Sequence, residues 1–102
     1  MAHKVVFRPI AAADLKRIYL DIADKTGHER AGGYVTRIEA ACLSLDTFPE
    51  RGTVRDHILP GLRLIGFEHS AAIAFRVVSD DLVEVLRILK RGEDMPDDWS
   101  DA

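Results

Sequence analysis

Cysteine and long apolar runs are scarce in this chain of 102 residues. The single cysteine, Cys42, excludes an internal disulfide framework and fits a reducing cytoplasm. It lies among alanine and leucine in a helical pattern, which favours a packed small side chain over a reactive thiol. No apolar run approaches the roughly 20 residues that cross a bilayer, and Phe7-Arg8-Pro9 interrupts any signal-peptide core. We therefore expect a cytoplasmic protein without a membrane partner.

The sequence also lacks the spacings that mark metal, cofactor and nucleophilic sites. Its four histidines are scattered, without the short intervals of a metal site: His3, His28, His57 and His69. There is no glycine-rich phosphate-binding motif, and no serine lies in a nucleophile elbow. We therefore expect no metal, no cofactor and no conventional catalytic residues.

Charge is distributed unevenly along the chain. The 14 Lys and Arg residues and 17 Asp and Glu residues give a net charge of −3. Five of the 17 carboxylates lie in the last ten residues, which contain no Lys or Arg: Glu93, Asp94, Asp97, Asp98 and Asp101. The rest of the chain contains the other 12 Asp and Glu residues and all 14 Lys and Arg residues. This body is therefore far less basic than a strong nucleic-acid binder. The sequence predicts one domain over residues 1–92 and an acidic tail over residues 93–102.

The strongest structural signal is a pair of apolar runs, residues 71–78 and 82–91, around the polar turn Ser79-Asp80-Asp81. This pattern is typical of an antiparallel hairpin. Strict alternation predicts that one strand turns Ile73, Phe75 and Val77 to one side and Ala74 and Val78 to the other. In the next strand, strict alternation places Val83 and Val85 on one face and Leu86 and Ile88 on the other. Because both faces are apolar, the hairpin is expected at the centre of a sheet.

The rest of the chain supplies two helices and two further strands. Residues 4–8 and 62–67 are predicted strands, and residues 10–25 and 28–46 are predicted helices joined by a short break at Gly27. The order β-α-α-β-β-β predicts an α+β fold in which a two-helix hairpin packs on one face of an antiparallel sheet. Two helices cover only one face, so we expect the other face to form a partner surface and the natural state to be a complex.

Arginines on the predicted strands are unusual, since a charge on a central strand is costly unless it reaches solvent or a partner. Three of them are candidates for a working surface: Arg63, Arg76 and Arg87. Beside Arg76, the small Ala72 and Ala74 are expected to leave a shallow trough. The arginines are either ordinary surface residues paired with nearby carboxylates or the walls of a cationic groove for a partner segment.

Several short motifs recur in a characteristic order. Residues 5–18 read Val-Val-Phe-Arg-Pro-Ile-Ala-Ala-Ala-Asp-Leu-Lys-Arg-Ile, and residues 80–89 read Asp-Asp-Leu-Val-Glu-Val-Leu-Arg-Ile-Leu. Between them lie these further matches: Gly27, Ala31, Tyr34, Ile38, Leu45, Pro49, Gly52 and Gly61-Leu62-Arg63. Together, over roughly residues 4–92, they resemble the ParE/RelE superfamily of toxins from bacterial type II toxin–antitoxin systems.

The two branches of this superfamily imply different activities. RelE-like toxins cleave mRNA on the ribosome with strand arginines, lysines and a C-terminal tyrosine or histidine. This chain keeps Arg63, but it has Ala72 near the place of a second arginine, no tyrosine after Tyr34 and no histidine after His69. It resembles the ParE branch more, and that branch poisons DNA gyrase by protein–protein contact.

The resemblance implies a toxin that is neutralised by a ParD-like antitoxin and meets DNA only through that antitoxin. We expect Arg63, Arg76 and Arg87 to receive carboxylates of the antitoxin, because guanidinium groups bind carboxylates bidentately. The end of the last strand, Lys90-Arg91-Gly92, is the predicted contact with the target. The alternatives are a RelE-like ribosome-dependent mRNA endonuclease and a non-toxic antitoxin-binding module.

Overall fold

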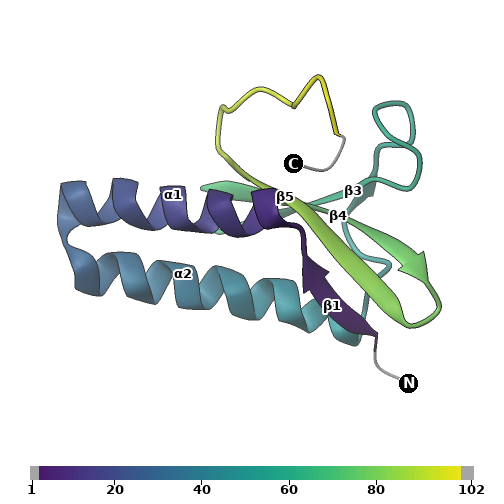
Figure 1. The fold of residues 1–102 in the computed structure, drawn as a ribbon, viewed down its shortest axis with the longest axis horizontal. Coiled ribbons are helices and arrows are strands. Elements are labelled where there is room, and N and C mark those ends of the chain that lie inside the picture. The colour runs from purple at the N-terminus through teal and green to yellow at the C-terminus, as the bar shows by residue number, and fades with distance from the viewer. Residues whose placement is uncertain (1–2, 100–102) are drawn as a thin grey trace.

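The computed structural model describes residues 3–99 and contains two helices and one five-stranded sheet (Figure 1). The elements are β1 (Lys4–Phe7), α1 (Pro9–Thr26), α2 (His28–Leu43), a 3₁₀ turn η1 (Ser44–Asp46), β2 (Thr53–Val54), β3 (Arg63–Phe67), β4 (Ala71–Ser79) and β5 (Leu82–Lys90). The strand order is β1-β5-β4-β3-β2. The predicted α+β fold is confirmed. The sheet is mixed, however, because β1 runs parallel to β5 while the other pairs are antiparallel.

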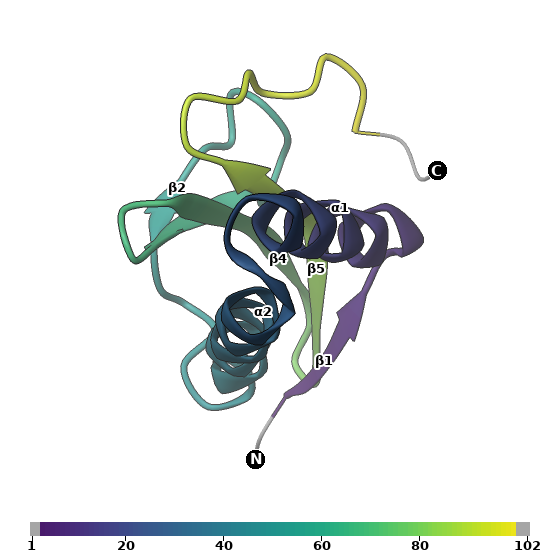
Figure 2. The ribbon, with the colours of Figure 1, turned by 90° about the vertical axis from the view of Figure 1, so that its left-hand side faces the viewer.

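The two helices form an antiparallel hairpin with sharp local boundaries. Pro9 occupies the first turn of α1, where its missing N–H costs nothing. Gly27, at φ +100°, ends α1 and begins α2. The second helix is shorter than predicted, because residues 44–46 form the 3₁₀ turn η1 and not the last turn of α2. In Figure 2, which looks along the helical hairpin, α1 lies beside β5, and α2 lies below α1. The first helix thus fastens the hairpin to the sheet.

The main core lies between the hairpin and the sheet. It contains these buried residues: Ala11, Leu15, Ile18, Ile38, Cys42, Leu45, Ala71, Ile73, Phe75, Val83, Val85 and Ile88. Cys42 has no exposed surface, and burial raises the pKa of its thiol to about 12. The thiol is therefore protonated at neutral pH, which confirms that Cys42 is a packed side chain and not a reactive group.

A β-bulge in β5 corrects the predicted alternation. Ala74 pairs with Arg87 and Phe75 pairs with Val85, so Leu86 is an extra residue on β5. An extra residue reverses the alternation beyond it. Ile88 therefore packs in the main core with Val83 and Val85, and the prediction that it lies on the face of Leu86 is wrong.

The sheet face turned away from the helices, here called the second face, is partly covered by the chain itself. Leu62, Ala74 and Leu86 are buried there. Their cover comes from Ile58 and Leu59 of the loop before β3 and from Trp99 of the C-terminal segment, and Leu64 of β3 packs beside them. The trough expected beside Ala72 and Ala74 is therefore filled at Ala74, where the loop and Trp99 supply large side chains, whereas a hollow remains beside Ala72.

Two glycines near the second face offer a matched test of backbone strain. Gly52 has φ +83°, and a Cβ there would lie 2.3 Å from the carbonyl oxygen of Leu64. Gly61 has φ +81°, but a Cβ there would meet nothing within 4 Å. We expect Gly61→Ala to lower the free energy of unfolding by about 1–2 kcal/mol through strain alone. Gly52→Ala adds an overlap with backbone and is expected to lower it by about 1–3 kcal/mol more. Urea unfolding measures both, and equal losses would contradict the close approach of residue 52 to β3.

Candidate partner-binding surfaces

Arg87 is bound within the fold by a buried carboxylate. Its Nε and Nη2 donate to the Oδ2 and Oδ1 of Asp14 on α1, at 2.7 and 3.0 Å. The N–H of Ile88 also donates to Asp14, at 2.9 Å. This pairing with Asp14 raises the pKa of Arg87 above its ordinary value. β1 pairs with β5 only as far as Val85. Beyond that point, Asp14 accepts the hydrogen bond of the Ile88 N–H, which β1 does not reach.

Arg76 lies on the second face beside a shared carboxylate. Its Nε donates to Glu84 at 3.2 Å, and the Nε of Arg8 lies 3.3 Å from the other oxygen of the same carboxylate. Two guanidinium groups therefore surround one carboxylate, which leaves a local excess of positive charge. The Arg76 side chain keeps 32% of its surface exposed, so it is accessible to a partner.

Arg63 begins β3 and is half-buried. Its pairing partner Phe75 faces the helices, and Ile65 and Phe67 pack against the same core, so Arg63 belongs to the helix side of the sheet. Within residues 3–99 its side chain has no hydrogen bond or ion pair. The predicted strand arginines therefore lie apart: Arg63 on the helix side, Arg76 on the second face and Arg87 at the edge of β5.

The predicted target contact, Lys90-Arg91-Gly92, lies at the end of β5, where the chain turns. Lys90 reaches Asp21 of α1 at 3.1 Å, and this hydrogen bond, helped by Lys25, holds the pKa of Asp21 below its ordinary range. Arg91 is exposed and donates to the carbonyl oxygen of His69 at 3.4 Å. Gly92 turns the chain at φ +82°. Of the three residues, Arg91 offers the most accessible charge.

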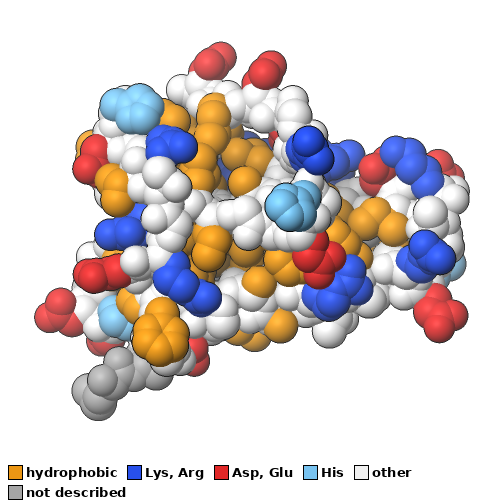
Figure 3. All heavy atoms as spheres, turned by 180° about the vertical axis from the view of Figure 1, so that it is seen from behind, with side chains coloured by type: hydrophobic (Ala, Val, Ile, Leu, Met, Phe, Trp, Pro, Cys, Tyr) orange, Lys and Arg blue, Asp and Glu red, His pale blue; other side chains and the backbone are white. Residues whose placement is uncertain are grey.

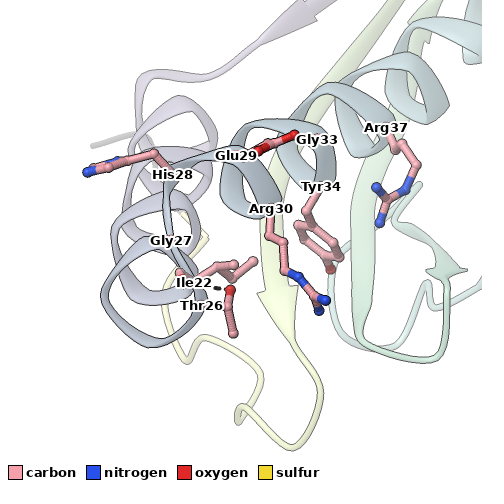
Figure 4. Close-up of a pocket in the computed structure, with 9 residues that line it drawn as sticks. All are labelled: Ile22, Thr26, Gly27, His28, Glu29, Arg30, Gly33, Tyr34 and Arg37. Atoms are coloured by element: carbon pink, nitrogen blue, oxygen red, sulfur yellow. Dashed lines mark hydrogen bonds between the residues drawn. The ribbon is translucent and has the colours of Figure 1, made fainter.

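Sequence reasoning missed a groove beside the turn that joins the two helices (Figure 4), with a volume of about 850 Å³. Arg30, Tyr34 and Arg37 of α2 line it together with Ile22 of α1. Arg37 forms a bidentate pair with Glu68 at 2.8 and 3.0 Å and lies over the Tyr34 ring. The Arg30 side chain has no hydrogen bond or ion pair in the described part of the chain. The groove thus combines apolar surface with an available cation, and the helical spacing of Arg30, Tyr34 and Arg37 was its only signal.

Apolar and cationic side chains lie close together on the surface of the described residues (Figure 3). Among residues 3–99, no group of histidine, cysteine and carboxylate side chains is arranged to hold a metal ion. None of the helices in that range is long and apolar enough to span a membrane. The back of the molecule instead shows hydrophobic side chains interspersed with Lys and Arg (Figure 3). Such mixed surfaces suit contact with amphipathic protein segments.

Comparison with known proteins gives consistent matches over most of the chain. Residues 5–95 match the family described as "ParE toxin of type II toxin-antitoxin system, parDE". Toxin ParE3 of Caulobacter vibrioides is 32% identical over 89 residues, which cover 87% of this chain and 86% of that toxin. A solved structure titled "Chromosomal ParDE TA system from P. aeruginosa" superposes with a TM-score of 0.76 at 28% identity, covering 87% of this chain and 96% of that one. The chain therefore belongs to the ParE toxin family of type II toxin–antitoxin systems.

Proposed function

We propose that this ParE-type toxin inhibits DNA gyrase by protein–protein contact and is neutralised by a ParD-like antitoxin. The observation that carries the proposal is the match of residues 5–95 to ParE toxins. The similar solved structure is titled as a ParDE system, which supports an antitoxin as the partner. Because gyrase acts on the chromosome, the proposal includes a cytoplasmic location.

The surroundings of the strand arginines favour an inhibitor over a ribonuclease. RNA cleavage by a 2′-hydroxyl needs a base, an acid and cations at the phosphate. Asp14 engages Arg87, and Glu84 engages Arg76. Among residues 3–99, no histidine or tyrosine side chain hydrogen-bonds either of them or Arg63. The alternatives are an mRNA endonuclease and an antitoxin-binding module without toxicity.

The proposed antitoxin contact uses the helical hairpin and the sheet. An amphipathic helix fits the groove beside Tyr34, where Arg30 would receive a carboxylate. An extended acidic segment on the second face would pair with Arg76, and a separate carboxylate of the antitoxin would pair with Arg63 on the helix side; both arginines retain accessible donors. Arg87 contributes by holding β5 against α1 through Asp14.

A supercoiling assay with purified gyrase tests the proposed target. We expect the toxin to inhibit supercoiling and to leave mRNA on translating ribosomes uncut. The double variant Lys90→Ala/Arg91→Ala should lose inhibition, because it removes two cations from the proposed contact, and should still bind the antitoxin. Lys4→Ala/Lys16→Ala removes the same charge from exposed positions elsewhere and should inhibit normally. Cleavage of mRNA with supercoiling unaffected would instead establish the endonuclease.

A further inference from the structure

The acidic C-terminal segment is folded back onto the body of the protein. After β5, Gly92 at φ +82° turns the chain, and residues 93–99, here called the tail, return over the sheet (Figure 1). The tail and α2 lie on opposite sides in both ribbon views (Figures 1 and 2). The segment predicted as a mere acidic extension therefore covers part of the second face, with residues 100–102 outside the described part of the chain.

Both ends of the tail are fastened. At its start, the Glu93 carboxylate accepts hydrogen bonds from Arg17 at 3.3 Å and from the Lys90 N–H at 3.0 Å. At its end, the carbonyl oxygen of Trp99 accepts a hydrogen bond from Arg8 at 2.7 Å. The Trp99 side chain packs on the cluster that contains Leu86. Only about 10 Å³ of space remains beneath this end, too little to hold a water molecule comfortably.

The middle of the tail is loosely supported. A hollow of about 500 Å³ lies between Met95 and the end of the sheet, beside Ala72 and Leu89. In addition, the indole Nε1 of Trp99 is buried without a hydrogen-bond partner among the described residues, while the buried Nε of Arg8 lies 3.3 Å from Glu84 but outside hydrogen-bond geometry. A buried donor without an acceptor is unfavourable. The tail therefore occupies the second face without satisfying all of its polar groups.

The surface beneath the tail is complementary to an acidic segment. Arg8, Arg17 and Arg87 line it, and the tail presents its carboxylates and one large aromatic side chain to them. A partner segment of the same chemistry, acidic and extended with a large apolar residue, would meet the same groups. It would also reach Arg76, which shares Glu84 with Arg8.

We propose that the tail is an intramolecular competitor that the antitoxin displaces: an extended acidic segment of the antitoxin takes the place of residues 93–99 on the second face. This inference rests on the proposed antitoxin partner. Closure of the tail lowers the apparent affinity for the antitoxin by the fraction of molecules in which the tail is open. The tail thus sets the antitoxin concentration at which the toxin is neutralised.

Trp99 reports on this exchange directly, because it is the only tryptophan of the chain. The probe is the antitoxin encoded beside this toxin, with any tryptophan replaced by phenylalanine, added to the full-length toxin. We expect tryptophan emission to shift to longer wavelength and acrylamide quenching to increase as the complex forms. Size-exclusion chromatography measures complex formation independently.

A variant pair tests the competition. Trp99→Ala removes the apolar anchor and should tighten antitoxin binding by about tenfold. Asp97→Asn removes a tail charge that contacts neither anchor and should leave the affinity unchanged. A complex in which the Trp99 emission keeps its wavelength and acrylamide quenching does not increase would overturn the proposal that the antitoxin displaces the tail. It would leave the proposed function intact. Exposure of Trp99 by gyrase and not by the antitoxin would also overturn it, and absence of any complex would overturn both proposals.

Discussion

Replacement of Asp14 by alanine is expected to lower the free energy of unfolding by about 3–5 kcal/mol, the loss typical of breaking a buried ion pair. The Asp14 side chain is 4% exposed and the Arg87 side chain 18%, so the unpaired guanidinium would be left largely without water. The N–H of Ile88 would lose its acceptor as well. Chemical denaturation followed by circular dichroism measures the change.

The comparison with Asp21 isolates burial as the cause. Asp21 lies about two helical turns further along α1 and also bridges to β5, through Lys90. Its side chain is 37% exposed, so Asp21→Ala should change the unfolding midpoint little, as is usual for surface ion pairs. Similar losses for the two alanine variants would show that the Asp14–Arg87 pair has no special role in joining α1 to the sheet.

Substitution of the accessible strand arginines is expected to weaken antitoxin binding strongly. If Arg76→Ala or Arg63→Ala removes a guanidinium that binds an antitoxin carboxylate, the loss should be about 2–5 kcal/mol, mostly through faster dissociation. Arg63 has no partner within residues 3–99, so its substitution should leave the stability of the free toxin nearly unchanged. Surface plasmon resonance with immobilised antitoxin measures the dissociation rates.

The control for this series is Lys16→Ala, an exposed cation of α1 without a recorded partner in the described chain. It should leave the dissociation rate unchanged. Arg87→Ala is unsuitable for the same test, because loss of the Asp14 pair would alter the fold itself. Unchanged dissociation rates for both Arg63→Ala and Arg76→Ala would remove these two arginines from the proposed contact.

Local patterns predicted most of the elements and little of their mutual arrangement. Alternation in residues 71–78 correctly turned Phe75 toward the main core, and Gly27 correctly separated the two helices. The two-residue β2 escaped prediction because so short a strand carries no periodicity. The parallel pairing of β1 with β5 was equally invisible, since it depends on how the helical hairpin returns the chain to the sheet.

The candidate sites show the same limit. Asp14 and Arg87 were both conspicuous in the sequence, but 73 positions separate them, and only the packing of α1 along β5 brings them together. Ile88 was assigned to the wrong face because a bulge at Leu86 has no local signature. The trough at Ala74 was predicted from the small residues of one strand, without the loop and Trp99 that fill it.

The position of β5 also governs when the protein becomes a folded toxin. Among residues 3–99, the last strand to be synthesised lies between β1 and β4, and it provides the only strand partner of β1. A nascent chain that stops before Leu82 therefore has an unpaired first strand and an Asp14 without Arg87. Such distant pairings close late in folding. A chain that lacks β5 is therefore expected to lack the folded sheet and the Asp14–Arg87 pair, so the surfaces proposed for partner contact form only once the last strand has been synthesised.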